Sequence, residues 1–353
     1  MLQVMKNSAL SAKIHAMMGK ALTDRDYDAL MNMKTVPQVA SYLIDNTSYA
    51  AAFEGVSPAE LHRTRLERIL RENLRDDINR IKPFMSSGAK RFAEIMTLGE
   101  GVEKIKLCLR LMSIGHPENI REYMSYIPTG RGGIPVSSAG SAESIDAFIE
   151  VLSGTPYYEA LTMFLRRPER QKLFRMETAL DAYWAGLVAK YAKKYLSGEE
   201  AKSVVKLYGT EFDLENLTFL LRCKKNFEMT EDEMFASIIP MYCKLKKETV
   251  LKIVKSASYK EALSVISEET PYGLAFSETD RFIEKRQTEF LAKRVMRTIR
   301  NNRYSVMSPI CYIHLRRIET NNIVSIIEGI RYGLEPDKIR SYLINYGKGG
   351  KGL

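Results

Sequence analysis

Thr47-Ser48-Tyr49-Ala50-Ala51-Ala52-Phe53 is the stretch that decides the fold, because the chain returns to it twice. The copies are Thr155-Pro156-Tyr157-Tyr158-Glu159-Ala160-Leu161 and Ala257-Ser258-Tyr259-Lys260-Glu261-Ala262-Leu263. This first motif is Tyr-x-x-Ala followed by Phe or Leu, and an apolar residue stands six positions before each tyrosine. Such a motif predicts that Tyr49, Tyr157 and Tyr259 pack their rings at helix-turn-helix corners, with each hydroxyl bonded or hydrated. We therefore interpret the three tyrosines as a structural repeat.

A second motif alternates with the first. It starts at Glu103-Lys104-Ile105, Glu215-Asn216-Leu217 and Asn321-Asn322-Ile323. Each start leads into an apolar helix, a short break (residues 115–117, 228–230 or 333–336) and another helix. The copies close with Tyr123-x-x-x-Ile127, Phe235-x-x-x-Ile239 and Arg340-x-x-x-Ile344. Two motifs that alternate three times, at spacings of about 105 residues, predict three related helical domains over residues 1–133, 134–243 and 244–353.

Apolar residues recur at helical spacing through most of the chain. Their pattern predicts long helices over residues 57–82, 89–113, 168–196 and 278–302. Ser57 and Pro58 suit the N-cap and first turn of the first of these helices. The sequence shows no series of alternating strands, and the glycines and serines of residues 129–141 predict a surface loop. We therefore expect an all-α protein.

The composition is that of a soluble globular protein. Of 353 residues, 45% are hydrophobic and 27% are charged, which excludes a wholly disordered chain. No uninterrupted apolar run approaches the roughly 18–20 residues that would span a bilayer. The first residues show no signal-peptide core, so we expect the protein to remain in the cytosol.

The residues that would carry catalysis or bind a metal do not cluster. Four cysteines and four histidines are scattered, without the spacing of a zinc site. No P-loop is present, since Gly347-Lys348-Gly349-Gly350-Lys351-Gly352 lacks the Ser or Thr that would follow. Acidic neighbours such as Asp76-Asp77 point about 100° apart on a helix and cannot form a shared acid–base pair. We expect no catalytic residue, no metal site, no cofactor and no bound nucleotide.

The net charge of +10 is concentrated near the C-terminal end. Residues 244–353 carry 21 basic and 12 acidic side chains, and eight of the basic ones lie between Arg281 and Arg303. Lys293, Arg297 and Arg300 are four and three residues apart, so they share one helical face. The basic helix over residues 281–303 has two interpretations: an amphipathic core helix with a solvated face, or a docking face for an acidic or lipid-proximal partner.

With these residues in hand, the chain resembles the C subunit of the archaeal and bacterial A-type (V-type) ATP synthase, which is homologous to the d subunit of the eukaryotic vacuolar ATPase. The resemblance rests on the segment from Leu43 to Tyr49 with its copies, and on residues 319–334, where an acidic residue, Asn-Ile, an apolar helix and a Gly-Leu break follow one another. Lys13 departs from the pattern, because relatives commonly carry arginine there.

The resemblance implies a pseudo-threefold funnel of three similar helical domains and a place in the rotor. Such a protein is a socket, present once per complex, on the cytoplasmic face of the membrane. It receives central-shaft subunits of the D and F type and sits on the proteolipid ring. It couples ATP hydrolysis or synthesis to proton or sodium transport but does not itself hydrolyse ATP.

A soluble helical-repeat scaffold is the alternative. It would bind nucleic acid or acidic proteins through the basic third domain, as the charge of +10 suggests. Solenoid repeats are usually about 20–50 residues long, however, and no nucleic-acid module is recognisable. An enzyme of unknown type is the third possibility, because a site assembled from distant residues would escape a motif search.

Overall fold

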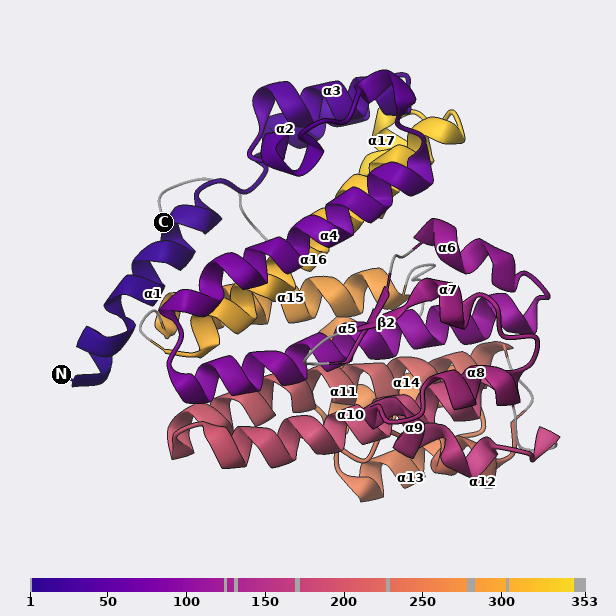
Figure 1. Cartoon of the computed structure of the whole chain (residues 1–353). Helices are drawn as coiled ribbons and strands as arrows, with labels where there is room; N and C mark the ends of the chain where they lie inside the picture. Colours follow the sequence, from indigo (N-terminus) through magenta and orange to yellow (C-terminus); the bar gives the residue numbers. More distant parts are fainter. Residues whose placement is uncertain are drawn as a thin grey trace. The chain divides into compact units, whose positions relative to one another are not determined.

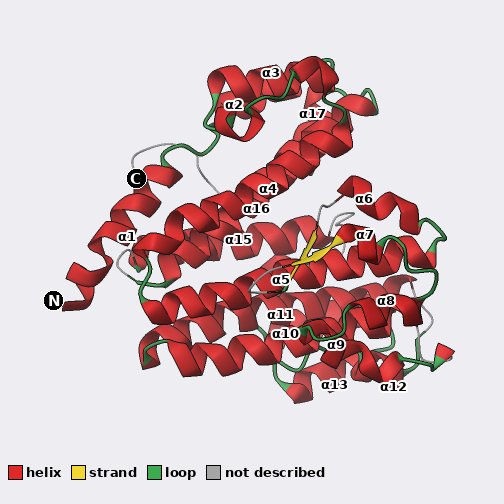
Figure 2. Cartoon of the chain, in the orientation of Figure 1, coloured by secondary structure: helices red, strands yellow, loops and turns green. Residues whose placement is uncertain are grey.

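The computed structural model of the chain describes residues 2–123, 126–129, 133–168, 172–226, 229–277, 283–302 and 305–345. Helices dominate, and the all-α prediction is confirmed (Figure 2). The chain divides into two compact units, which we call the terminal unit (Met1–Ser86 with Thr288–Leu353) and the middle unit (Ser87–Gln287). The three-domain division and the funnel stay predictions. Among the described helices, none combines the length and the hydropathy that a bilayer span requires.

The terminal unit combines the two ends of the chain. Its helices are α1 (Leu2–Met18), α2 (Asp24–Met31), α3 (Val36–Asn46), α4 (Arg63–Ile81), α16 (Met307–Arg331) and α17 (Pro336–Tyr342). Thr23 and Thr35 begin α2 and α3 with capping boxes, which satisfy the free N–H groups of the first turn. The two ends share one core, in which Leu43 and Leu66 from the N-terminal part pack with Ile323 from α16. Helices α4 and α16 lie side by side in this unit (Figure 1).

The middle unit is built around long helices with shorter ones beside them. Its elements are α5 (Ser87–Ser113), α6 (Ile120–Tyr123), β1 (Tyr126–Pro128), β2 (Gly133–Pro135), α7 (Val136–Ala139), α8 (Ile145–Val151), α9 (Pro156–Leu161), α10 (Leu173–Tyr195), α11 (Gly198–Asn226), α12 (Glu231–Ala236), α13 (Lys247–Lys255) and α14 (Tyr259–Glu269). The next helix, α15 (Ile283–Asn301), begins in the middle unit and ends in the terminal unit.

The pair α5 and α10 is antiparallel and closely packed. Gly88 meets Tyr195 at one end of the pair, and Arg110 binds Glu177 at the other. Between them, a Cβ added at Gly99 would lie 2.3 Å from the ring of Trp184, so glycine lets the indole approach the helix. Trp184 also donates its Nε1–H to the carbonyl of Ile95 at 3.2 Å.

Two of the predicted breaks are helix ends of the same type. After α5, Gly115 has a φ of +79°, and the N–H of His116 donates to the carbonyl of Leu111 at 2.9 Å. After α16, Gly333 has a φ of +63°, and the N–H of Leu334 donates to the carbonyl of Gly329 at 2.9 Å. Both are Schellman motifs, in which glycine adopts the left-handed conformation without strain. The third predicted break includes Glu228, which lies outside the described residues.

The structure corrects two local predictions. The helix predicted from Ser57 begins at Arg63, because a single 3-10 turn over Pro58–Glu60 is followed by extended backbone at Leu61 and His62. The predicted loop of residues 129–141 contains β2, which pairs antiparallel with β1 just before the loop, and Ile127 faces Ile134 in this pair. Ile127 is fully buried, so its contact with the core favours the pairing over an open loop. Residues 130–132 between the strands lie outside the described part.

Candidate functional site

Two of the three predicted tyrosines occupy similar buried positions. Tyr49 is 0% exposed and Tyr157 is 1% exposed. Tyr49 donates its hydroxyl to Glu319 Oε1 at 3.1 Å. Tyr157 donates to the carbonyl of Leu98 at 3.2 Å and also contacts the carbonyl of Pro128. Buried rings with bonded hydroxyls are what the first motif predicts at these two positions.

Tyr259 lies in a different environment. It is the first residue of α14, it is only half-buried, and its hydroxyl is 3.4 Å from the carbonyl of Ser277. The tyrosine that resembles Tyr49 is Tyr272, which is 0% exposed and donates to Asp213 Oδ2 at 2.6 Å. The place of Tyr259 in the repeat stays a prediction, and the contacts of Tyr272 are the ones that match those of Tyr49.

The threonine two positions before the tyrosine is the signal that the sequence analysis missed. Thr47 and Thr270 each end a helix and return their hydroxyl to a carbonyl four residues earlier, at 2.5 and 2.7 Å. Each threonine Oγ1 also accepts the N–H of its tyrosine, Tyr49 or Tyr272, at 3.2 Å. A Thr-x-Tyr pattern, preceded by an apolar residue six positions before the tyrosine, would have selected Tyr272.

Each buried tyrosine meets one position of the second motif. The three positions are Gly101, Asp213 and Glu319, each four residues before the Ile or Leu of that motif. Asp213 and Glu319 accept the hydroxyls of Tyr272 and Tyr49. At Gly101 the side chain is missing, and an added Cβ would lie 1.8 Å from the hydroxyl of Tyr157. The two motifs are therefore partners in the structure as well as neighbours in the sequence.

An asparagine at the start of the second motif forms hydrogen bonds with the isoleucine at the close of the same motif. Asn216 donates to the carbonyl of Ile239 at 2.9 Å and accepts the N–H of the same residue at 2.8 Å. Asn322 makes the same two bonds to Ile344, at 3.1 and 2.8 Å. The side-chain amide thus satisfies both polar groups of a backbone residue that no helix satisfies. Lys104 holds this position in the first copy.

A buried ionic network surrounds Glu319 in the terminal unit. Arg316, which is 6% exposed, bonds Asp77 at 3.0 Å and also pairs with Glu319. The other oxygen of Glu319 accepts the N–H of Leu22 at 2.9 Å. Burial, followed by the charge of Glu319, raises the pKa of Tyr49 well above its usual value, so this hydroxyl remains a donor.

The basic face predicted for residues 281–303 lies on α15. Lys293, Arg297 and Arg300 are exposed, whereas Val295 and Ile299 are buried. None of the three cations forms an ion pair with another residue in the described ranges. Arg281 and Arg303, at the two ends of the predicted segment, lie outside the described residues.

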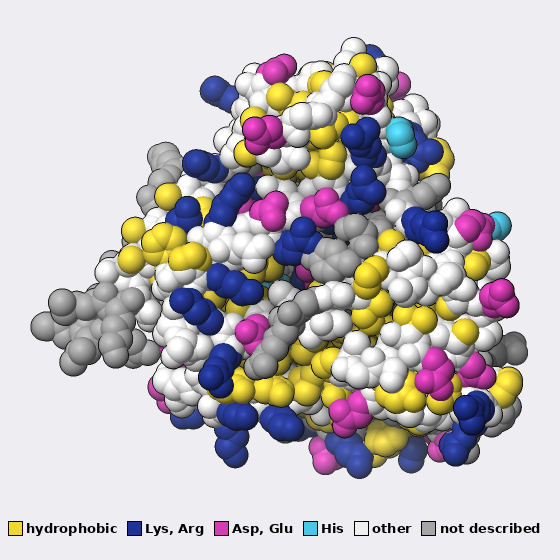
Figure 3. Space-filling view, in the orientation of Figure 1, with side chains coloured by type: hydrophobic (Ala, Val, Ile, Leu, Met, Phe, Trp, Pro, Cys, Tyr) yellow, Lys and Arg dark blue, Asp and Glu magenta, His cyan; other side chains and the backbone are white. Residues whose placement is uncertain are grey.

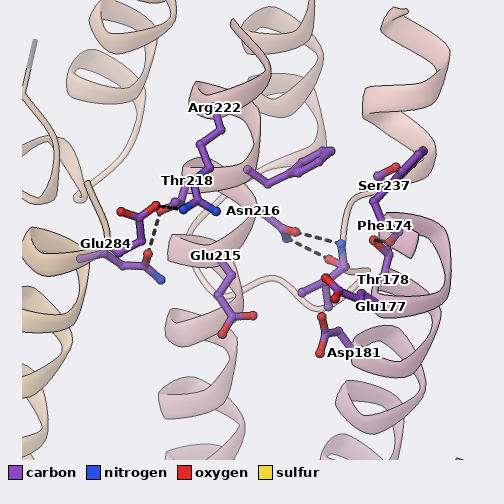
Figure 4. A pocket seen from close by; sticks show the side chains of 13 residues that line it. Phe174, Glu177, Thr178, Asp181, Glu215, Asn216, Thr218, Arg222, Ser237 and Glu284 are labelled. Carbon is purple, nitrogen blue, oxygen red and sulfur yellow. Dashed lines mark hydrogen bonds and ion pairs between the residues drawn. The ribbon is translucent and has the colours of Figure 1, made fainter. Parts of the chain in front are cut away.

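The middle unit contains a cavity of about 280 Å³ whose wall is acidic. Glu177 and Asp181 come from α10, Glu215 from α11 and Glu284 from the start of α15 (Figure 4). Arg222 of α11 pairs with Glu284 at one side of the cavity. The wall is therefore assembled from three helices and carries four acidic side chains.

Lys106 lies behind this wall and partly neutralises it. Its Nζ is 2.5 Å from Asp181 Oδ1 and 3.0 Å from Glu103 Oε1. Burial nevertheless raises the pKa of Asp181 to about 6, although Lys106 acts in the opposite direction. Burial and the nearby charge of Glu211 raise the pKa of Glu215 well above its ordinary value. The cluster therefore binds protons more tightly in the folded chain than in the unfolded one.

We expect Asp181→Asn to change how stability depends on pH. An unfolded aspartate has a pKa of about 3.9, and the folded value is about 6. The wild type should therefore lose stability relative to the variant as pH rises from about 4 to about 6, by up to about 2 kcal/mol. Urea unfolding across this range measures the difference. Glu150→Gln, at an exposed position, is the control, and identical pH profiles for Asp181→Asn and wild type would contradict the assignment.

The fold and the site together define a class: a helical protein whose polar side chains mainly hold its own elements together and whose cavity carries four acidic side chains. The family model described as ATP synthase (C/AC39) subunit, vATP-synt_AC39, matches residues 10–342, and the chain belongs to this family. The predicted resemblance is confirmed at this level.

Relatives in archaea, each named as the C subunit of an A-type ATP synthase, match along almost the whole chain. The relative from Methanocaldococcus jannaschii is 23% identical over 351 residues, which cover 95% of this chain and 86% of the relative. The one from Pyrococcus abyssi is 24% identical and covers 94% of this chain and 88% of the relative. The one from Methanococcoides burtonii is 25% identical, with 95% and 93% covered.

Proposed function

We propose that the chain is a non-catalytic central-stalk subunit of a rotary A- or V-type ATP synthase. It would act as the socket between central-shaft subunits of the D and F type and the membrane proteolipid ring, once per complex, on the cytoplasmic face. In this role it couples ATP hydrolysis or synthesis to proton or sodium transport. The observation that carries the proposal is the family match over residues 10–342, together with relatives named as C subunits of A-type ATP synthases.

The packing of the chain suits a part that transmits torque. A socket must not yield between shaft and ring, and closely packed protein interiors transmit strain with little compression. Buried ties such as Arg316 to Asp77 and Asn216 to Ile239 join elements distant in sequence within one unit. Tight contacts such as Gly99 against Trp184 leave little room for sliding.

The recurring tyrosine contacts support the proposed three-domain organisation. Tyr49 contacts Glu319, Tyr157 contacts the segment around Gly101, and Tyr272 contacts Asp213. These three contact residues occupy the same position in the three copies of the second motif. We propose that the segments 1–133, 134–243 and 244–353 are three versions of one helical domain. Each tyrosine would then join its domain to the second motif of the preceding domain in a closed cycle.

We expect charge reversal on α15 to weaken assembly. Lys293→Glu, Arg297→Glu and Arg300→Glu together should reduce binding to reconstituted shaft and ring about tenfold at low salt. Each exposed ion pair contributes only about 0–1 kcal/mol, so the effect is collective. The difference between variant and wild type should diminish as salt is added, because the Debye length falls to about 8 Å at physiological ionic strength and is shorter at higher salt. Co-purification with detergent-solubilised shaft and proteolipid subunits measures it.

Lys246→Glu, Lys255→Glu and Lys260→Glu form the matched control, because they change the net charge equally at exposed positions of the middle unit. If both triple variants assemble like wild type at low salt, α15 has only a solvated basic face. If wild type itself fails to assemble with shaft and ring, the proposed function is wrong. Stoichiometric micromolar binding of ATP in calorimetry would contradict the non-catalytic role.

A further inference from the structure

A cluster of cations and tyrosines occupies one end of the α5–α10 pair. It consists of Arg91, near the start of α5, and Lys190, Tyr191, Lys193, Lys194 and Tyr195, in the last turns of α10. We call it the basic–aromatic patch. Dark-blue side chains gather at the lower left of Figure 3, where this end of the pair lies in Figure 1. The proposed function gives the patch no role.

The cations of the patch are exposed and lack acidic partners. Arg91, Lys190, Lys193 and Lys194 are exposed, and none of them forms an ion pair with any residue in the described ranges. The two acidic residues that follow α10 along the chain are engaged elsewhere. Glu199 pairs with Lys202 at 2.8 Å, and Glu200 accepts the hydroxyl of Ser197 at 2.8 Å. The positive field is therefore not cancelled locally and favours an anionic surface.

The two tyrosines give the patch an amphipathic base. The rings of Tyr191 and Tyr195 stack with their centroids 5.4 Å apart and their planes at 27°. Lys194 lies 5.2 Å and Arg91 5.5 Å from the centroid of Tyr195, and Lys190 lies 5.9 Å from that of Tyr191. Tyrosine beside Lys and Arg is the composition that favours the level of lipid headgroups, where a ring has one apolar and one wet end.

We propose that the basic–aromatic patch binds the anionic headgroups of a phospholipid surface. The lysines supply compact point charges for the phosphates, and the tyrosines supply aromatic edges at the boundary with the acyl chains. The inference rests on the proposed function only because a membrane-bound complex would bring the patch within reach of a bilayer.

The ring geometry favours headgroups over nucleic acid. Single-stranded RNA binds basic surfaces largely by stacking its bases on free aromatic faces. In the patch, Tyr191 and Tyr195 stack on each other, and cations lie near the ring centroids. The patch therefore offers charge and ring edges to a ligand more readily than it offers a stacking platform.

Vesicle flotation of the full chain tests the proposal. Wild type should bind vesicles of phosphatidylcholine mixed with phosphatidylserine, ignore vesicles of phosphatidylcholine alone, and dissociate at high salt. Replacing Lys190, Lys193 and Lys194 with Gln should weaken binding roughly 100-fold, since each lysine near a charged membrane raises the affinity by a factor of about five. Replacing the same residues with Arg should preserve it.

Lys246→Gln, Lys255→Gln and Lys260→Gln form the control, with the same change in net charge on the same unit, and should bind like wild type. Equal binding by the two Gln variants, or equal binding of wild type to neutral and anionic vesicles, would overturn the proposal. The proposal would also be overturned if the chain bound single-stranded RNA more tightly than anionic vesicles and if that binding depended on the same lysines. Circular dichroism and melting of each variant establish that it is folded.

The outcomes separate this inference from the proposed function. If the chain assembles with shaft and ring but does not bind anionic vesicles, only the proposal that the patch binds lipid is contradicted. A chain that binds the vesicles through the patch but fails to assemble contradicts the rotor role alone.

Discussion

Glu319→Ala is expected to lower the free energy of unfolding of the terminal unit by about 3–5 kcal/mol, the usual cost of removing one partner from a buried ionic network. The substitution leaves the hydroxyl of Tyr49 and the N–H of Leu22 without their acceptor, and it leaves Arg316 with Asp77 alone. Each of these donors is buried, so water cannot easily replace the lost carboxylate.

The two units allow this effect to be located. Trp184, the single tryptophan of the chain, lies in the middle unit, so its fluorescence reports that unit while circular dichroism reports both. Glu319→Ala should shift the dichroism transition in guanidinium chloride more than the fluorescence transition. Glu54→Ala, at an exposed position of the terminal unit, should shift neither by more than about 0.5 kcal/mol. A change for Glu319→Ala as small as this control would contradict the structural role of the network.

Gly101→Ala is expected to destabilise the middle unit by about 3 kcal/mol, at the upper end of the range for overpacked cores. The new methyl group would lie 1.8 Å from the hydroxyl of Tyr157 and 2.6 Å from the carbonyl of Pro128. Either the tyrosine leaves its buried position and loses its bond to the carbonyl of Leu98, or α5 moves away from β1.

Gly186→Ala provides the matched control for this prediction. Gly186 is also inside a long helix of the middle unit, but nothing lies within 4 Å of an added Cβ. There alanine should stabilise the chain by about 0.5–1 kcal/mol through helix propensity. The fluorescence of Trp184 during unfolding measures both variants. Equal shifts for Gly101→Ala and Gly186→Ala would show that Tyr157 does not hold the position described.

The helices were predictable from the sequence because their signals are local. The apolar spacing of residues 89–113 identified α5, and the Gly-Leu break identified the end of α16. The predicted start of α4 was wrong. Ser57 and Pro58 are typical of the first turn of a helix, but the backbone becomes extended at Leu61 and His62, and the helix begins only after them.

The contacts of the candidate site that the sequence did not indicate depend on information that is not local. Tyr259 fits the first motif, but what distinguishes a core tyrosine is its acceptor, and Asp213 lies 59 residues before Tyr272. The acidic cavity likewise draws its carboxylates from α10, α11 and α15, so no short segment contains the cluster. The basic face of α15 was predictable, since three cations at helical spacing are a local pattern.

The way the two chain ends share the terminal unit affects the order of folding during synthesis. Tyr49 and Leu22 cannot reach Glu319 until the ribosome has added 270 and 297 further residues. At about 5–20 residues per second, this is a delay of roughly 14 to 60 s. The middle unit is one uninterrupted segment and can fold during that interval. The nascent N-terminal segment would meanwhile expose an incomplete core, so chaperones that shield apolar surface should engage it before the last helices emerge.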